Sequence, residues 1–341
     1  MRFLPALLTV FPAFAQSLVL ESGAARMNWD LAGGGLVDFH LKDGQVNPLT
    51  WEDGTGAAVR LRGHFICLDR WGAPSDAEKA AGMPYHGEAP RIRWRQIGKT
   101  ASDLEMAVQL PMARLAVKRT VHLEDTAAVV TESVTNENPL GRVYNFVQHP
   151  TIAPPFLDET TVVDANARQG LMQSSPMPNP EHPTVVWPQA LKDGVPVSLR
   201  FLKDDPQPNV VSYVIDDEFG WTTVITPGKA LLLGYVWRTA DYPWFSAWRD
   251  VRNGKPSARG LEFGTTGLHQ PYPVLVRKGR IFGRPLFAFL DAAQTETRRY
   301  QAFLLRVPTG LTGIDRMRRE RGEFLFDGRD GKQYRVRDLL R

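Results

Sequence analysis

The sequence predicts an all-β fold made of stacked antiparallel sheets. Apolar and polar residues alternate with a period of two along many short segments, a pattern typical of strands that bury one face. Turns rich in Gly, Pro, Asn and Asp separate these segments. Helical signals are confined to two short stretches, 75–81 and 313–321, which are too short to build a helical layer.

The clearest alternation lies in two neighbouring segments, 104–110 and 115–123. In the first of them, Leu104, Met106 and Val108 alternate with polar or small residues, which predicts a half-buried strand. Short segments of similar character predict further strands along the chain. They are expected at 35–41, 57–68, 127–135, 143–148, 210–215, 221–226, 231–237, 286–290 and 300–307.

The amino terminus reads as a secretory signal peptide over residues 1–15. Arg2 precedes an apolar run, 3–14, and an Ala-Phe-Ala ending stands before Gln16. This run is too short to span a bilayer, which needs about 20 apolar residues, and no second run of that length follows. We therefore expect a secreted or periplasmic mature chain, 16–341, with no membrane span.

The mature chain is expected to form one domain. Its apolar fraction of 43% can fill a large core, and the one cysteine, Cys67, cannot form a disulfide within the chain. The Pro-rich segment 174–188 is the best candidate for a domain boundary, but a loop leaving one large sandwich explains it equally well.

The charge pattern argues against a nucleic-acid partner. The chain carries 41 basic and 37 acidic residues, a formal net charge of +4, and the two signs are interleaved along the sequence. Even the densest basic run, 315–341, contains Asp and Glu throughout and few aromatic residues. Such a run is typical of a solvated surface rather than a phosphate-binding one.

The stretch "GMPYHGEAP", 82–90, places His86 and Glu88 in a segment that its Gly and Pro residues keep out of regular helix and strand. It predicts a loop that presents both side chains to a ligand, although a plain polar turn fits equally well. No His-x-Glu-x-His or paired-cysteine motif accompanies them, so no metal and no cofactor are expected.

Two later stretches carry one candidate each. In "YNFVQHPTIAPP", His149 follows a predicted strand directly and precedes a proline-braced loop, although many strand-end histidines only bind a backbone carbonyl. In "GLEFGTTGLHQPYP", Glu262 stands between Leu261 and Phe263. Apolar neighbours could desolvate this carboxylate and make it a better base, or strand alternation could turn it to solvent.

In this order, the early His-Gly loop, the strand ending in His149-Pro150 and the late strand with Glu262 resemble the galactose mutarotase-like superfamily, the aldose 1-epimerase group. The resemblance covers most of the mature chain and implies a large antiparallel β-supersandwich. It implies that His149 is the general acid on the ring oxygen of a sugar and Glu262 the general base on the anomeric hydroxyl. His86 would help to hold the sugar.

The chain departs from this family at two places. The usual early Asn-Arg element is not evident, and the family's His-Pro-Tyr-Phe-Asn stretch reads His-Pro-Thr-Ile-Ala from His149 onwards. Arg70 or Arg62 could supply the missing cation. The aspartate partner could be Asp241 or Asp164.

Further residues are assigned to sugar binding. His269 follows Glu262 in the same stretch, and Trp237 belongs to an aromatic segment that could offer a flat apolar face to a sugar or simply pack in the core. The other aromatic residues considered in that segment are Tyr242, Trp244 and Trp248.

Two functions are compatible with the sequence. The first is an exported mutarotase-like isomerase that uses His149 and Glu262 on a sugar or oligosaccharide. The second is a carbohydrate-binding protein that kept the groove and lost turnover. The three retained residue types favour the first, and the two departures favour the second.

Overall fold

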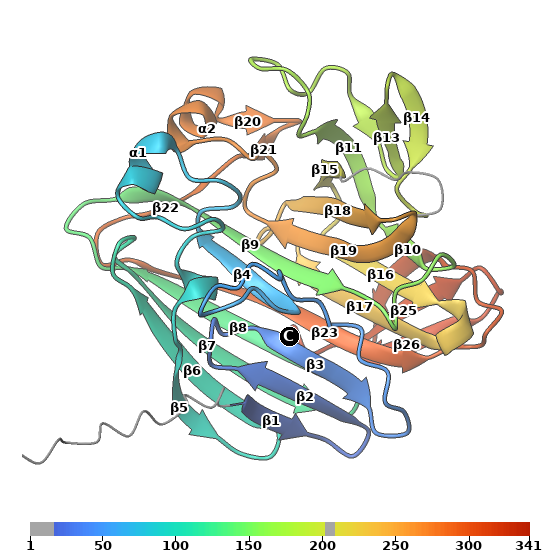
Figure 1. Cartoon of the computed structure of the whole chain (residues 1–341). Coiled ribbons are helices and arrows are strands. Elements are labelled where there is room, and N and C mark those ends of the chain that lie inside the picture. Colours follow the sequence, from blue (N-terminus) through green and yellow to red (C-terminus); the bar gives the residue numbers. More distant parts are fainter. Residues whose placement is uncertain (1–16, 202–208) are drawn as a thin grey trace, which may run out of the picture.

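The computed structural model describes residues 17–201 and 209–341, so the expected signal peptide lies outside the described residues. Two large antiparallel sheets lie one over the other and confirm the all-β prediction (Figure 1). The larger sheet has 11 strands in the order β1 (Ser17–Glu21), β2 (Ala25–Asp30), β3 (Leu36–Leu41), β4 (His64–Asp69), β9 (Arg142–Ile152), β19 (Lys255–Gly264), β18 (Trp244–Arg252), β15 (Asn209–Ile215), β11 (Ala167–Met172) and β12 (Val185–Val186), with β22 (Ala288–Leu290) paired to β9.

The second sheet has eight strands and packs behind the first in Figure 1. Both segments with the clearest alternation, 104–110 and 115–123, lie in it as neighbouring strands. The strand order is β10 (Val162–Ala165), β16 (Phe219–Thr226), β17 (Leu231–Arg238), β23 (Thr295–Arg306), β8 (Ala127–Asn136), β7 (Leu115–Glu124), β6 (Asp103–Leu110) and β5 (Arg95–Lys99).

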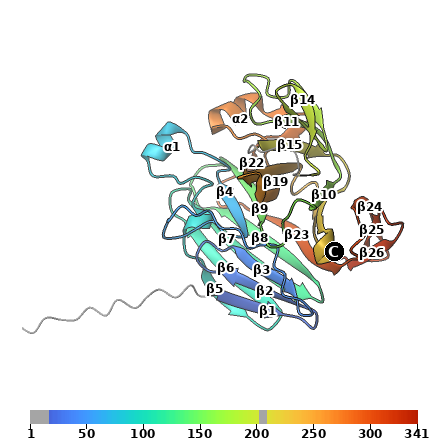
Figure 2. The ribbon, with the colours of Figure 1, turned by 45° about the vertical axis from the view of Figure 1, so that its right-hand side comes forward.

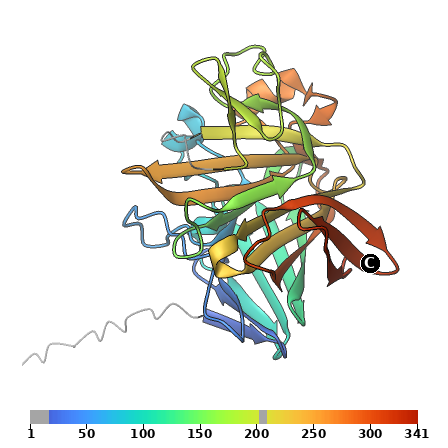
Figure 3. The same cartoon turned by 90° about the vertical axis from the view of Figure 1, so that its right-hand side faces the viewer.

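Short elements gather at one end of the larger sheet, at the top of Figures 1 and 3. They are α1 (Asp76–Ala80), α2 (Tyr272–Lys278), and the hairpins β13 (Gln189–Lys192) with β14 (Val195–Ser198) and β20 (Arg280–Ile281) with β21 (Arg284–Pro285). Two 3₁₀ helices, η1 (Ala89–Arg91) and η2 (Pro227–Lys229), complete the connections. The α1 helix agrees with the prediction for 75–81, because Ser75 and Glu78 form a capping box at its start.

A third sheet near the carboxyl terminus stands to one side, next to β10 (Figure 2). It consists of β24 (Ile314–Glu320), β25 (Glu323–Gly328) and β26 (Gln333–Arg337). The helix expected at 313–321 was therefore wrong. The charged sequence of β24 has little periodicity, so pairing with β25 decides its conformation. Strand β25 is itself held by the second sheet, because its Phe324 and Phe326 are buried against Phe219 and Trp221 of β16.

Two strand boundaries also differ from the prediction. The strand expected at 57–68 begins only at His64, because the chain turns at Gly63 with a φ of +53° and close to the Leu36 carbonyl. The strand expected to end at 148 continues to Ile152, so His149 lies within β9 and not after it.

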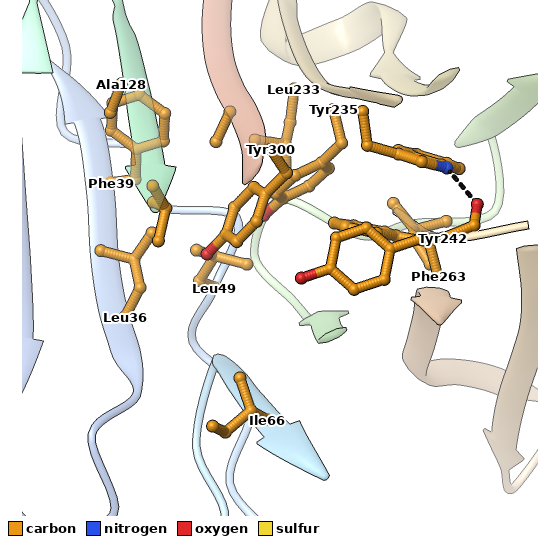
Figure 4. Close-up of a cluster of buried hydrophobic side chains, with 14 of the residues drawn as sticks. Leu36, Phe39, Leu49, Ile66, Ala128, Leu233, Tyr235, Tyr242, Phe263 and Tyr300 are labelled. Carbon is orange, nitrogen blue, oxygen red and sulfur yellow. Dashed lines mark hydrogen bonds between the residues drawn. The ribbon is translucent and has the colours of Figure 1, made fainter. Parts of the chain in front are cut away.

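The main core lies between the two large sheets (Figure 4). Ile66 and Phe263 contribute from the larger sheet, and Leu233 and Tyr300 from the second sheet. These residues alternate with others that point to the outer face of the larger sheet, as the pleat of a strand requires. Strands β4, β9 and β19 therefore present a second row of side chains away from the core.

The loop 82–88 returns the chain to the outer face of the larger sheet. His86 and Gly87 both have positive φ, +68° and +79°. A Cβ at Gly87 would stand 2.3 Å from the Leu68 carbonyl oxygen, so only glycine lets the loop lie this close to β4.

We expect Gly87→Ala to destabilise the protein by roughly 3 kcal/mol or more, because it adds a backbone collision to the strain of a left-handed alanine. Gly54→Ala is the matched control, since Gly54 has a φ of +59° and nothing within 4 Å of its added Cβ. The control should cost only about 1–2 kcal/mol. Urea unfolding of both variants measures the difference, and equal losses would contradict the close contact with Leu68.

Candidate functional site

The candidate site lies on the outer face of the larger sheet, across β4, β9, β19 and β18. Strand alternation places it there: Leu261 and Phe263 enter the core, and Glu262 between them points the other way. Glu262 is nevertheless only 2% exposed, because side chains and loops cover this face as well. The expectation that alternation might leave this carboxylate in solvent is therefore not met.

A cavity of about 250 Å³ opens at this place. Aromatic and imidazole rings form most of its wall, together with two carboxylates and one guanidinium. The lining residues are Trp51, Asp53, Thr55, Leu61, Phe65, Trp71, Tyr85, His86, Arg91, His149, Val210, Trp248, Glu262 and His269.

His149 and Glu262 are in direct contact, with 3.3 Å between Nε2 and Oε1. The antiparallel register produces this contact, since β19 pairs with β9 through Gly260 with Thr151 and Phe263 with Gln148, and the same register sets Glu262 opposite His149. Phe65 is the partner of His149 on β4.

Two neighbours hold the His149 ring in one orientation. The Phe65 ring stacks on it with centroids 4.3 Å apart and planes 18° apart. The second neighbour is Thr151, whose hydroxyl oxygen lies 2.9 Å from Nδ1 of the imidazole. With Nδ1 engaged in this way, Nε2 is the nitrogen that faces Glu262.

The second oxygen of Glu262 has a different partner. The Trp71 indole N–H donates to Oε2 over 2.6 Å, from a side chain that is itself buried. Oε1 of Glu262 therefore contacts His149, and Oε2 accepts a hydrogen bond from Trp71.

Burial sets the protonation state of this pair. It raises the pKa of Glu262 to about 8, against the opposing effect of the Trp71 hydrogen bond, and it lowers the pKa of His149 to about 3. At neutral pH the single proton of the pair is therefore on the carboxyl group, which can donate it to Nε2. This part of the cavity wall therefore carries a neutral acid beside a neutral imidazole.

His86 forms the next part of the wall. Its Nδ1 accepts the backbone N–H of Gly72 over 3.1 Å and lies 3.1 Å from the Cys67 sulfur, so Nε2 carries the hydrogen of the neutral ring. Burial holds the pKa of His86 well below its ordinary value. Its ring centroid is 5.2 Å from that of His149.

His269 closes the wall beside Trp71, with ring centroids 4.0 Å apart. Its backbone N–H donates to the Gln173 side chain, whereas its Nε2 is buried and has no hydrogen-bond partner among the described residues. Burial lowers the pKa of His269 to about 4.

Asp53 and Arg91 are cavity residues that the sequence reasoning missed. The two side chains form an ion pair of 2.8 Å, and Arg91 also donates to the Val59 carbonyl. Arg91 is the last residue of η1, which directly follows the loop of His86. This closeness in sequence to His86 was the one feature that could have pointed to Arg91 as a site residue. Nothing in the sequence around Asp53 resembles a known motif.

No family model matches the sequence, and no curated protein sequence matches it. Among solved structures, a galactose mutarotase-like protein from Lactobacillus casei is 14% identical, with a TM-score of 0.63 over 85% of this chain and 100% of that one. A galactose mutarotase related enzyme from Lactobacillus acidophilus is 11% identical, with a TM-score of 0.64 over 86% and 98%. The Slr1438 protein from Synechocystis is 14% identical, with a TM-score of 0.64 over 90% and 100%.

The chain has the galactose mutarotase-like fold. This confirms the supersandwich that the sequence resemblance implied.

Within the galactose mutarotase-like fold, four of the predicted site residues line one cavity. They are His86, His149, Glu262 and His269. Their chemical roles remain predictions. Trp248, considered with the aromatic segment, also lines the cavity.

Three predicted binding residues lie elsewhere, and their assignment is corrected. Glu88 turns away from the cavity and accepts the backbone N–H groups of Met112 and Ala113, because the left-handed residues before it reverse the chain. Arg70 is buried behind the cavity, paired with Glu78. Trp237 lies in the core, stacked on Phe263 at 4.2 Å between centroids.

The open alternatives for a cation and an aspartate also lie outside the cavity lining. Arg62 pairs with Asp30, Asp164 pairs with Arg200, and Asp241 accepts the Arg299 backbone N–H. Arg91 is the guanidinium, and Asp53 one of the two carboxylates, that line the cavity. Tyr242 is in the core and Trp244 packs in a cluster with α2.

Residues 17–201 and 209–341 contain no group of three or more His, Cys, Asp or Glu side chains placed to hold a metal ion. None of the helices in this part of the chain has the length and apolarity needed to cross a membrane.

We expect Glu262→Gln to gain stability relative to the wild type as pH rises from 5 to 9. The folded protein binds the Glu262 proton more tightly than the unfolded chain does, so wild-type stability falls between the ordinary pKa of 4.5 and the folded value of about 8. The glutamine variant lacks this loss, which is on the order of a few kcal/mol.

Urea unfolding of both proteins at a series of pH values measures the difference. The exposed Glu159→Gln controls for loss of a carboxylate at the surface. A Glu262→Gln difference that stays constant across the series would show that burial does not hold the proton on Glu262.

Proposed function

We propose that the cavity binds a sugar and that His149 and Glu262 interconvert its anomers, in a protein exported from the cell. The observation that carries this proposal is the 3.3 Å contact between one carboxyl and one imidazole group inside an aromatic-walled cavity. Sugar ring opening needs one group that takes a proton and one that gives a proton, and no cofactor.

The size and walls of the cavity suit a single sugar unit. Its volume of about 250 Å³ lies just below the range of drug-sized pockets, roughly 300–1,000 Å³. Trp51, Trp71 and Trp248 offer flat apolar surfaces to the C–H faces of a pyranose. His86 and His269 can hydrogen-bond the hydroxyl groups at its edge.

The charges of the cavity favour an uncharged sugar. The three histidines are neutral, because burial lowers the pKa of each, and burial keeps Glu262 protonated by raising its pKa. Arg91, the one guanidinium of the lining, is paired with Asp53. A sugar phosphate or sugar acid would bring an uncompensated negative charge into this space, at a high desolvation cost.

The proposed reaction starts with a proton transfer within the pair. The proton held on Glu262 moves over the 3.3 Å contact to His149 Nε2, which leaves a carboxylate and an imidazolium. The carboxylate takes the proton of the anomeric hydroxyl while Nε2–H protonates the ring oxygen. The bond between the anomeric carbon and the ring oxygen breaks, and a carbonyl group forms. Rotation of the aldehyde and the reverse steps give the other anomer.

A second candidate is a carbohydrate-binding protein without turnover. The Thr-Ile-Ala sequence after Pro150 favours it, since this stretch departs from the family pattern. Export in either case rests on the signal-like residues 1–15.

We expect Glu262→Gln to slow anomer interconversion by roughly 10²- to 10⁴-fold, because the amide keeps the size of the side chain but cannot take a proton. Polarimetry of freshly dissolved α-glucose and α-galactose compares the variant with the wild type, and calorimetry measures sugar affinity, which should change far less. A wild-type protein that binds a sugar but accelerates neither anomeric conversion would support the second candidate.

Within the 82–88 loop, we expect His86→Asn to weaken sugar binding roughly 2- to 10-fold, the effect of one lost hydrogen bond, with little change in melting temperature. Asparagine tolerates the left-handed backbone of this position. Glu88→Gln should show the opposite result, lower stability with unchanged affinity, because Glu88 binds only backbone N–H groups of the protein. Equal effects of both variants on affinity would contradict the division of roles.

A further inference from the structure

Trp71 stands out among the cavity residues because it touches the reacting carboxyl group directly. Its indole N–H donates to Glu262 Oε2 over 2.6 Å, whereas His149 Nε2 lies 3.3 Å from Oε1. The two oxygens of the Glu262 carboxyl group therefore have different partners. Without the hydrogen bond from Trp71, the carboxyl group could rotate and exchange the positions of its oxygens.

We propose that Trp71 is a positioning residue that fixes the rotation of Glu262, so that Oε1 is the oxygen which exchanges a proton with His149 and with the sugar. This inference rests on the proposed function of the same cavity. Because the indole N–H occupies Oε2, the proton of the neutral pair is directed to Oε1. Once that proton has moved to His149, the same N–H stabilises the carboxylate that remains.

The surroundings of Trp71 hold its indole in place. The His269 ring packs against it, and the following residue, Gly72, has a φ of +83° and approaches His269 so closely that a Cβ there would lie 2.6 Å from the imidazole Nε2. The preceding residue, Arg70, is fixed between the Glu78 carboxylate and the Tyr272 ring, 4.3 Å from its centroid. Arg70 thus supports the site through Trp71 without entering the cavity.

Several titratable groups surround Glu262, and they come from different elements. They are His149 on β9, Cys67 on β4, and Tyr85 with His86 on the loop 82–88. Trp71 differs from all of them because its indole N–H donates a hydrogen bond but does not ionise at ordinary pH. Removing it changes the hydrogen bonding of Glu262 and adds or removes no charge.

Burial raises the pKa of Glu262, and the Trp71 hydrogen bond opposes that rise. Losing the indole N–H should therefore move the titration of Glu262 to higher pH. A residue that merely fills space would not shift this titration in that direction.

The experiment compares Trp71→Phe with the wild type by ¹³C NMR of protein labelled at the glutamate carboxyl carbons. Glu262→Gln identifies the resonance of Glu262. We expect its titration midpoint to move to higher pH in Trp71→Phe. We also expect kcat for anomer interconversion to fall roughly 10- to 100-fold, with a much smaller change in KM. The alkaline limb of kcat/KM should move in the same direction as the midpoint, because the active pair holds one proton.

Trp248→Phe is the matched control, since it removes another indole from the same cavity wall. It should weaken sugar binding and leave the Glu262 midpoint where it is in the wild type. An unchanged midpoint in Trp71→Phe, or an equal shift in Trp248→Phe, would overturn the proposal.

A second measurement does not depend on the folding of Trp71→Phe. In the wild type, the ¹H resonance of the Trp71 indole N–H should lie far downfield, and it should move upfield in Glu262→Gln. An indole resonance that does not respond to this change would also overturn the proposal. Neither NMR measurement needs a sugar. A wild-type protein without anomerase activity would refute the proposed function, and the NMR results would still show whether Trp71 positions Glu262.

Discussion

The period-two alternation of β4, β9 and β19, held in one antiparallel register, is the constraint on which the site depends. The core takes Ile66, Phe146 and Phe263 from these strands, and the residues between them form the cavity wall. A slip of one residue in either pairing would send Glu262 or His149 into the core and bring apolar side chains to the cavity. The packing that stabilises the sandwich therefore also fixes the distance between the two proposed reacting groups.

Two buried glutamates of this fold have contrasting partners. Glu132, on the core side, is bound by the Arg119 guanidinium at 2.6 Å and also accepts from Gln148, next to His149 in the chain. Glu262, on the cavity side, has an indole and a neutral imidazole as partners and no cation. A paired cation offsets the cost of burying a negative charge, whereas the cavity carboxyl must keep its proton to avoid that cost.

Local pattern was sufficient for some parts of this structure and insufficient for others. The alternation in 104–110 predicted β6, because the alternating burial of this strand is already visible in its own residues. The strand β24 was missed, since its conformation depends on β25 and on aromatic residues from distant strands. Within the site, His86 was identifiable from its loop motif, and His149 from the His-Pro sequence, although β9 continues beyond it. Trp71 and Asp53 were not, because their approach to the cavity is a result of tertiary packing.

The misassigned residues show the same limit at shorter range. Glu88 is two positions from His86, but two left-handed residues, His86 and Gly87, separate the directions of the two side chains. Sequence distance therefore says little about shared orientation in such a loop.

The contact between His149 and Glu262 adds a further constraint on any ligand, because a sugar hydroxyl that enters between the two groups must replace this contact. Such a hydroxyl both donates and accepts, so it can satisfy each group in turn and carry the proton between them. A ligand group without a hydrogen to donate would leave one member of the pair buried and unpaired, at a cost of about 1–3 kcal/mol. If the proposed function is right, the cavity would select hydroxylated ligands by the same contact that would begin their chemistry.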